Sequence, residues 1–407
     1  MIFSLDNEVE LEQTFQDLKS NSYNLDLTRG KPSLEQLDLS SGLFSINLAK
    51  FSNSIDIRNY GELLGLEVCR EFGSKILKFP KENVIAGGNS SLTLMSQYLA
   101  SLYLHGSGNG PWLSSERISF LCPVPGYDRH FKLCEEFGIN MIPIPLTGSG
   151  PNIDIAKRLV KEDPSIKGIW CIPKHSNPTG ETYNEECIKG LLELANIRKS
   201  DFKILWDNAY AVHDFDHSED LADIFMLSKE SKAEDSIIAF TSTSKITFPG
   251  AGISFIAMSK NNLDLFCKHY SSTVIGPDKV NQARHVLFLK NYENLLNHMK
   301  GHAEILKPKF EMVEKWLSHL NNCSWTKPKG GYFVSFNSAP GLAKKIIKLS
   351  EEAGLKLTPA GSTFPYGVDP KDENIRLAPT ACTLEELEKA MEIFVVCVSL
   401  ANLESKV

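Results

Sequence analysis

The feature of this sequence that most constrains its fold is a pattern repeated along its middle: a short apolar run, then a polar turn, then an amphipathic stretch. This alternation is typical of βαβ units, in which parallel strands form a sheet that helices cover on both faces. We therefore predict an α/β fold with a mostly parallel sheet. Strands are expected at 118–122, 141–145, 168–172, 203–206, 237–240 and 253–258, and helices at 128–137, 153–161 and 184–197.

The pattern changes after Ser259 to long helical stretches, 262–271 and 279–320, which are followed by two predicted strands at 331–336 and 374–378. Predicted helices at 342–353 and 384–401 flank the second strand, so a smaller α+β domain is expected here. The expected division is an N-terminal arm with part of the small domain (1–50), a large α/β domain (51–300) and a small C-terminal α+β domain (301–407). A bent or broken helix around 300–306 would be the hinge.

Length and charge exclude some classes of function. The 407 residues can bury a large core without disulfide or metal staples. Lys and Arg number 43 against 50 Asp and Glu, a net charge of −7, which disfavours nucleic acid as a partner. The nine Cys are scattered without a C-x-x-C pair, the N-terminus lacks the features of a secretory signal, and no apolar run approaches the roughly 20 residues that span a bilayer. A cytoplasmic protein without a membrane segment is expected.

Polar residues follow four of the apolar runs. In an open parallel sheet, ligands bind outside the carboxyl ends of the strands, so these residues are expected to meet at one edge. The four polar segments are Gly87-Gly88-Asn89-Ser90-Ser91, Asn177-Pro178-Thr179-Gly180, Asp207-Asn208-Ala209-Tyr210 and Ser242-Thr243-Ser244-Lys245.

These residue types suit a cofactor that carries a carbonyl, a ring nitrogen, a phenolic oxygen and a phosphate, and pyridoxal phosphate has all four. Lys245 would form an imine with the aldehyde, which requires a lowered pKa for its amine. Asp207 would keep the pyridine nitrogen protonated, so that the ring acts as an electron sink. Tyr210 and Asn177 would donate hydrogen bonds to the ring oxygen.

The phosphate of this cofactor is expected at the turn Asn89-Ser90-Ser91. The turn precedes a predicted helix, whose first backbone N–H groups and dipole favour an anion. Ser242 would add a hydroxyl. Asn89, Ser90 and Ser242 could instead only cap helices, and Asp207 could do the same.

The three motifs around Asn177, Asp207 and Lys245, in this order, resemble those of class I aminotransferases among the fold-type I pyridoxal phosphate enzymes. The resemblance covers nearly the whole chain, because it extends from Tyr60-Gly61 to Gly330-Gly331-Tyr332-Phe333 and Ile375-Arg376-Leu377-Ala378. The stretches 28–32 and 245–252 are similar to those of a bacterial aspartate aminotransferase subgroup.

The resemblance implies several further roles. Tyr127 would stack on the cofactor ring, and His130 would support Asp207. Arg376 would bind the substrate α-carboxylate, since a planar guanidinium fork suits a carboxylate, and Asn177 and Gly30 would also lie at the substrate. Tyr60 would reach the phosphate in a neighbouring subunit, which implies a homodimer with shared sites.

The sequence departs from the family at Gly252, where an arginine that neutralises the phosphate is usual. Lys279 or Arg284 of the partner subunit could compensate, or the cofactor could bind more weakly. For a side-chain carboxylate of the substrate, the candidates are Arg29, Arg129 and Arg284.

The predicted activity is an aminotransferase that moves the amino group of an amino acid, best predicted as aspartate, to 2-oxoglutarate by a ping-pong mechanism. The alternatives are a lyase, decarboxylase or racemase of the same fold, because the cofactor permits each reaction, or a ligand-sensing regulatory domain. Residues 213–217 (His-Asp-Phe-Asp-His) have metal-ligand types, but their spacing matches no standard site, so a solvated loop without metal is expected.

Overall fold

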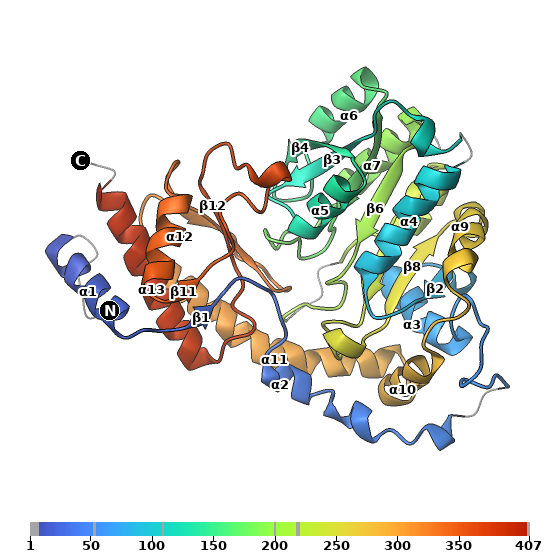
Figure 1. Ribbon diagram of the computed structural model, residues 1–407, viewed down its shortest axis with the longest axis horizontal. Helices are drawn as coiled ribbons and strands as arrows, with labels where there is room; N and C mark the ends of the chain where they lie inside the picture. Colours follow the sequence, from blue (N-terminus) through green and yellow to red (C-terminus); the bar gives the residue numbers. More distant parts are fainter. Residues whose placement is uncertain (1–7, 52–53, 108–109, 199–200, 217–219, 405–407) are drawn as a thin grey trace.

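The computed structural model describes residues 8–51, 54–107, 110–198, 201–216 and 220–404. Its largest sheet has seven strands in the order β2-β8-β7-β6-β5-β3-β4 (Figure 1). All run parallel except β8, which is antiparallel to both of its neighbours. The predicted α/β class is therefore confirmed. The strands are β2 (Val84–Ala86), β3 (Ser119–Val124), β4 (Asn140–Pro145), β5 (Ile166–Cys171), β6 (Lys203–Asp207), β7 (Ile237–Ser242) and β8 (Ser254–Met258).

Helices cover both faces of this sheet, because its central strands are apolar on both sides. Along β6, Leu205 belongs to one buried cluster and its neighbours Ile204 and Trp206 belong to the other. The Leu205 face is covered by α4 (Ser91–His105), α5 (Asp128–Glu136) and α9 (Lys260–Thr273). The opposite face is covered by α3 (Glu67–Leu77), α6 (Ile153–Glu162), α7 (Glu185–Arg198), α8 (Ile224–Glu230) and α10 (Lys279–Leu289).

The C-terminal part of the chain builds a second core, to which the N-terminus returns. Its sheet is antiparallel, with β10 between β12 and β9, and β1 near the N-terminus pairs with β11. Helix α1 packs on α13 at this end of the molecule (Figure 1). The elements are α1 (Glu8–Ser20), β1 (Leu25–Asp26), β9 (Ser324–Trp325), β10 (Val334–Asn337), α12 (Ala343–Glu352), β11 (Leu355–Lys356), β12 (Asn374–Leu377) and α13 (Leu384–Glu404).

Between the two cores, α2 (Leu34–Asp38) and the short 3-10 helices η1 (Ser41–Ser45) and η2 (Leu48–Lys50) run beside α10 and α11. The other short 3-10 helices are η3 (Lys81–Asn83), η4 (Trp112–Ser114), η6 (Glu234–Ser236), η7 (Pro249–Ala251) and η8 (Pro365–Gly367). Among the residues described, no helix combines the length and the apolar composition that crossing a membrane requires.

Helix α11 (Tyr292–Leu317) is uninterrupted and contributes to both cores, Leu295 to the one at the large sheet and Leu317 to the other (Figure 1). A break around 300–306 is therefore wrong, whereas a bend there stays a prediction. The interruption lies at Lys290, whose φ is +61°, and Asn291 then caps the new helix by accepting from the N–H of Asn294 at 2.9 Å. We propose that the boundary between the expected domains falls inside α11.

Gly331 explains why β10 begins at Val334 rather than at 331. Its φ is +78°, which is outside the extended region, and a Cβ built on it would lie 2.8 Å from Cβ of His175. Glycine thus allows this turn to close against the segment that follows β5.

We predict that Gly331→Ala destabilises the protein more than Gly341→Ala does. Gly341 has a similar φ of +84° but no atom within 4 Å of its built Cβ, so its variant carries only the backbone strain, about 1–2 kcal/mol. The clash at position 331 should add about 1–3 kcal/mol. Urea unfolding of the two variants measures the difference, and equal losses would contradict the proposed contact.

Candidate active site

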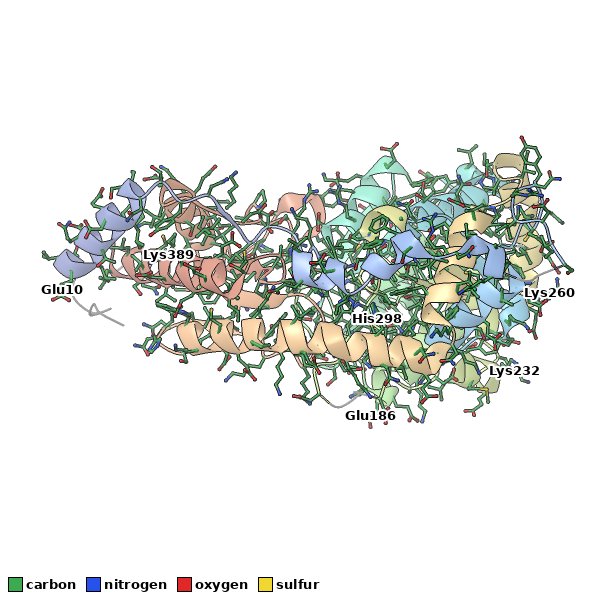
Figure 2. The ribbon with its side chains drawn as sticks, turned by 90° about the horizontal axis from the view of Figure 1, so that it is seen from below. Glu10, Glu186, Lys232, Lys260, His298 and Lys389 are labelled. Atoms are coloured by element: carbon green, nitrogen blue, oxygen red, sulfur yellow. The ribbon has the colours of Figure 1, made fainter. Side chains whose placement is uncertain are left out.

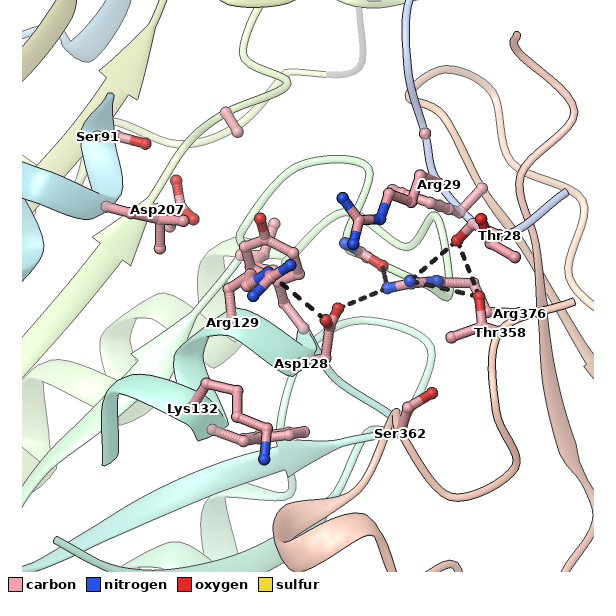
Figure 3. Close-up of a pocket in the computed structure, with 18 of the residues that line it drawn as sticks. Thr28, Arg29, Ser91, Asp128, Arg129, Lys132, Asp207, Thr358, Ser362 and Arg376 are labelled. Carbon is pink, nitrogen blue, oxygen red and sulfur yellow. Dashed lines mark hydrogen bonds and ion pairs between the residues drawn. The ribbon is translucent and has the colours of Figure 1, made fainter. Parts of the chain in front are cut away.

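A cavity of about 930 Å³ lies between the carboxyl edge of the large sheet and the C-terminal part of the chain (Figure 3). It brings together residues from segments that are far apart in the sequence. The predicted site residues that line it are Gly30, Asn89, Ser90, Tyr127, Asn177, Asp207, Tyr210, Ser242, Lys245 and Arg376. Tyr60 does not line the cavity of its own chain, and its exposed fraction is 81%.

Asp207 ends β6 as a buried carboxylate with one occupied oxygen and one free oxygen. Its Oδ2 lies 2.9 Å from Nε2 of His130, whose ring stacks on Trp170 with centroids 4.2 Å apart. Its Oδ1 is buried and has no hydrogen-bond partner among the residues that the structure describes. A buried acceptor without a partner is rare and unfavourable, so this oxygen is suited to a donor on a bound molecule.

Lys245 follows β7 and turns its amine into the same cavity. The ammonium lies 4.8 Å from the ring centroid of Tyr210 and 5.9 Å from that of Tyr332. Burial lowers the pKa of Lys245, while the negative charge of Asp207 acts in the opposite direction. A larger fraction of neutral amine is therefore available at a given pH than on a surface lysine, as a nucleophilic lysine requires.

Three histidines, none of them predicted as site residues, hold the backbone behind Lys245. Nε2 of His302 donates to the carbonyl of Ile246 at 3.0 Å, because its Nδ1 accepts from Gln36. Nε2 of His298 lies 2.8 Å from the same carbonyl, and this residue belongs to α11, where Figure 2 labels it. Burial and the neighbouring His298 lower the pKa of His302 to about 4, so its imidazole is neutral near pH 7.

His213 contacts this backbone too, with Nε2 at 3.3 Å from the carbonyl of Lys245. Burial, His302 and Lys245 lower its pKa well below the usual value. The only sequence signal for these three histidines was the i, i+4 spacing of His298 and His302, which places both on one face of a helix. This spacing does not indicate that the two side chains contact the carbonyl of Ile246.

The end of the cavity near α4 offers hydroxyl and N–H groups. Ser90 is the N-cap residue of α4, and its side chain makes no capping hydrogen bond. The hydroxyl of Ser242 donates to that of Ser244 at 2.9 Å, and Ser244 donates to the carbonyl of Asn89 at 3.3 Å. This arrangement suits an anion at the positive end of the helix.

Gly252 lies close to this end and leaves little room for a side chain. A Cβ built there would lie 3.0 Å from the carbonyl oxygen of Phe248 and 3.1 Å from Oγ1 of Thr243. The two cations suggested as substitutes do not line the cavity of their own chain. Lys279 is buried and donates to the carbonyl of Gly61 at 2.9 Å, next to Tyr60.

Arg376, in β12, forms the opposite end of the cavity and is buried. Its Nη1 lies 2.9 Å from Oδ1 of Asp128, and its Nη2 donates to the carbonyl of Thr28 at 3.2 Å (Figure 3). The ring of Phe333 lies 5.0 Å from the guanidinium carbon. The contacts of Asp128 and Phe333 with Arg376 were not predicted. In the local sequence, Asp128 looks like an ordinary residue at the start of a helix, and Phe333 looks like an ordinary core aromatic.

The loop after β6 is not the solvated segment that was expected. His213 is buried, and Asp214 accepts from Nζ of Lys174 at 2.8 Å and lies 2.9 Å from Nε2 of His175. The expectation failed because these charged residues pair with the segment after β5, which is distant in sequence. His217 lies outside the described residues.

The residues present fit pyridoxal phosphate. The free oxygen of Asp207 can accept from a protonated ring nitrogen, and Lys245 can reach an aldehyde in the same cavity. The end at α4 can hold the phosphate, and Tyr127 lines the cavity beside His130.

The chain resembles known proteins along almost its entire length. The family model for aspartate amino-transferase matches residues 4–407. An aspartate aminotransferase of Corynebacterium glutamicum is 41% identical, covering 97% of this chain and 93% of that protein. The crystal structure of an aspartate transaminase from the same organism has a TM-score of 0.94 at 40% identity and covers 98% of this chain and 96% of its own.

A more distant structure shows the same fold. It is an α-aminoadipate aminotransferase from Thermus thermophilus, complexed with N-(5′-phosphopyridoxyl)-L-leucine, with a TM-score of 0.78 and 19% identity over 98% of this chain and 96% of its own.

We predict that Asp214→Asn destabilises the protein strongly. The exposed fractions of the Lys174 and Asp214 side chains are 4% and 15%, so the variant leaves a buried cation without its counter-charge, at a cost of about 3–5 kcal/mol. Asp264→Asn is the control, because Asp264 pairs with Lys260 on an exposed helix surface and should matter little. Denaturant unfolding compares them, and a similar small change in both would contradict a structural role for the Asp214 cluster.

Proposed function

The chain belongs to the aspartate aminotransferase family and is a pyridoxal phosphate-dependent transaminase, and from this premise we propose that it transfers the amino group of aspartate to 2-oxoglutarate. The C. glutamicum relative named for aspartate supports the choice of donor. The proposed mechanism is ping-pong: the first keto acid leaves before the second binds.

The observation that carries this proposal is the placement of Lys245, Asp207 and Arg376 around one cavity. Lys245 contributes an amine with a lowered pKa, to which a cofactor can be attached. Asp207 contributes a carboxylate oxygen without a partner among the described residues, and Arg376 contributes a buried guanidinium. When bound, the cofactor supplies an electron sink for negative charge at the substrate Cα.

Each role then follows from the side chain. Lys245 would hold the cofactor covalently through Nζ and, once displaced by the substrate amine, would move the proton between Cα of the substrate and C4′ of the cofactor. Asp207, held by His130, would accept a hydrogen bond from the ring nitrogen. Arg376 would orient the α-carboxylate, with Asn177 beside it at 3.4 Å.

We also propose a homodimer with shared sites. Tyr60 and Phe44 are each 81% exposed and Ile275 is 65% exposed, so these large apolar side chains are accessible to a partner chain. A partner chain would cover them, and Tyr60 would then reach the phosphate in the neighbouring subunit. Lys279, bound to Gly61, would hold the segment that carries Tyr60.

We predict that Lys245→Ala lowers transamination of aspartate by at least about 10³-fold, because it removes both the attaching amine and the proton carrier. Borohydride should no longer fix the cofactor to the protein. Lys132→Ala is the control: Lys132 also lines the cavity but pairs with Glu135 at 2.6 Å, so its loss should have a small effect. A borohydride-fixed cofactor in the Lys245→Ala variant would contradict the assignment.

A further inference from the structure

The substrate end of the cavity holds more positive charge than one α-carboxylate requires. Arg29, Arg129 and Arg376 all line it, together with a single aspartate, Asp128, beside them (Figure 3). If the proposed function is right, the substrates carry a second carboxylate, and one of these guanidiniums must receive it. Which one does so depends on which guanidinium is already occupied.

Two of the three guanidiniums share Asp128. Its Oδ1 lies 2.9 Å from Nη1 of Arg376, and its Oδ2 lies 3.8 Å from Nε of Arg129. When a substrate α-carboxylate binds Arg376, Asp128 is still beside Arg129. The positive charge of Arg129 is therefore partly neutralised by the protein in either state.

Arg29 has no such partner. Within the described part of the chain, its guanidinium makes no hydrogen bond or ion pair, and it points from the N-terminal segment into the cavity (Figure 3). Besides Lys245, two lysines line the cavity, but Lys132 is paired with Glu135, and Lys31 presents a flexible point charge rather than a fork. A free planar guanidinium is the better receptor for a carboxylate.

The backbone that carries Arg29 is fixed relative to Arg376. The carbonyl of Thr28, the preceding residue, accepts from Nη2 of Arg376 at 3.2 Å and from Oγ1 of Thr358 at 2.8 Å. On the other side, a Cβ on Gly30 would lie 2.5 Å from Cζ of Phe333, the ring that packs on Arg376. The segment that carries Arg29 is thus clamped against Arg376 of β12, which fixes the origin of the Arg29 side chain beside the proposed α-carboxylate site.

We propose that Arg29 binds the side-chain carboxylate of a dicarboxylic substrate and so determines the substrate class of this enzyme. The residue comes from the same chain as Lys245 and Arg376. Arg284, the third candidate from the sequence, does not line this cavity.

The test measures discrimination between substrates in the holoenzyme. Arg29→Gln should lower kcat/KM for aspartate by about 30-fold, which is the range expected for the loss of one charge-assisted hydrogen bond. The kcat/KM for 2-aminobutyrate, which lacks the side-chain carboxylate, should stay within about 3-fold of the wild-type value. The same variant should weaken binding of succinate, a non-reacting dicarboxylate, by about 30-fold in a titration followed by cofactor absorbance. Arg29→Lys should recover part of the loss. The thermal midpoint of Arg29→Gln should match the wild type, because the side chain has no partner among the described residues to lose.

Matched variants at the other two cations decide the assignment. Lys31→Gln and Arg129→Gln should not change the preference for aspartate over 2-aminobutyrate by more than about 3-fold. If either variant, rather than Arg29→Gln, causes the selective loss, the assignment to Arg29 is overturned. It is also overturned if Arg29→Gln lowers activity equally with both amino acids.

Failure of the proposed function has a different signature. In that case the wild-type enzyme itself shows no preference for aspartate and no binding of succinate, which removes the dicarboxylic substrate and the role of Arg29 together. A wild-type preference for aspartate that Arg29→Gln leaves intact overturns only the inference.

Discussion

The site depends on one unfavourable arrangement: a lysine amine whose charged form is disfavoured by burial and favoured by an aspartate carboxylate at the same cavity. Burial lowers the pKa of Lys245, and Asp207 limits that shift. The surrounding structure maintains this balance. The buried imidazole of His213 contacts the carbonyl of Lys245, and that of His302 contacts the carbonyl of Ile246. Because His302 is neutral near pH 7, its hydrogen bond fixes this backbone without adding a positive charge. Cationic histidines there would oppose protonation of Lys245 more strongly and would themselves be costly to bury.

The C-terminal core supplies the other half of the site, and the N-terminal segment links the two. Residues 25–28 pair with β11 and meet Arg376, so substrate groups would be bound by a part of the chain that is distinct from the sheet that carries Lys245. Helix α11 passes beneath both parts and contributes side chains to each core. It also carries His302, so one element positions both the lysine backbone and the C-terminal core.

The parts of the fold that could be predicted from the sequence are those with local signals. The strands of the large sheet were predicted from apolar runs. Because ligands bind at the carboxyl ends of parallel strands, the polar residues that follow these runs, such as Asp207 and Lys245, were expected in one cavity. Contacts between distant segments had no such signal. Asp128 looks like an ordinary helix-start residue until β12 places Arg376 beside it, and Asp214 looks solvated until Lys174 and His175 are folded against it. The sequence did not predict the position of the break between α10 and α11. Gly301 lies inside the continuous helix α11, where a glycine is tolerated, whereas the break occurs at Lys290, which adopts a positive φ although lysine is not a residue type that signals one.

Gly252 stands where the family usually has an arginine, and this difference affects both the turn that carries Lys245 and the charge at the proposed phosphate site. Its neighbours leave little space for a Cβ, because the carbonyl oxygen of Phe248 and Oγ1 of Thr243 would lie 3.0 and 3.1 Å from it. That hydroxyl accepts from the N–H of Ile253 and from Thr247, so a larger side chain would disturb the turn that carries Lys245. Among the described residues, those that line the α4 end of the cavity, where the phosphate is proposed to bind, are uncharged: Asn89, Ser90, Ser91, Ser242 and Ser244. Neutral donors bind an anion more weakly than a guanidinium does. Cofactor affinity should therefore depend more on groups that the partner subunit adds in the proposed dimer than it would with an arginine at position 252.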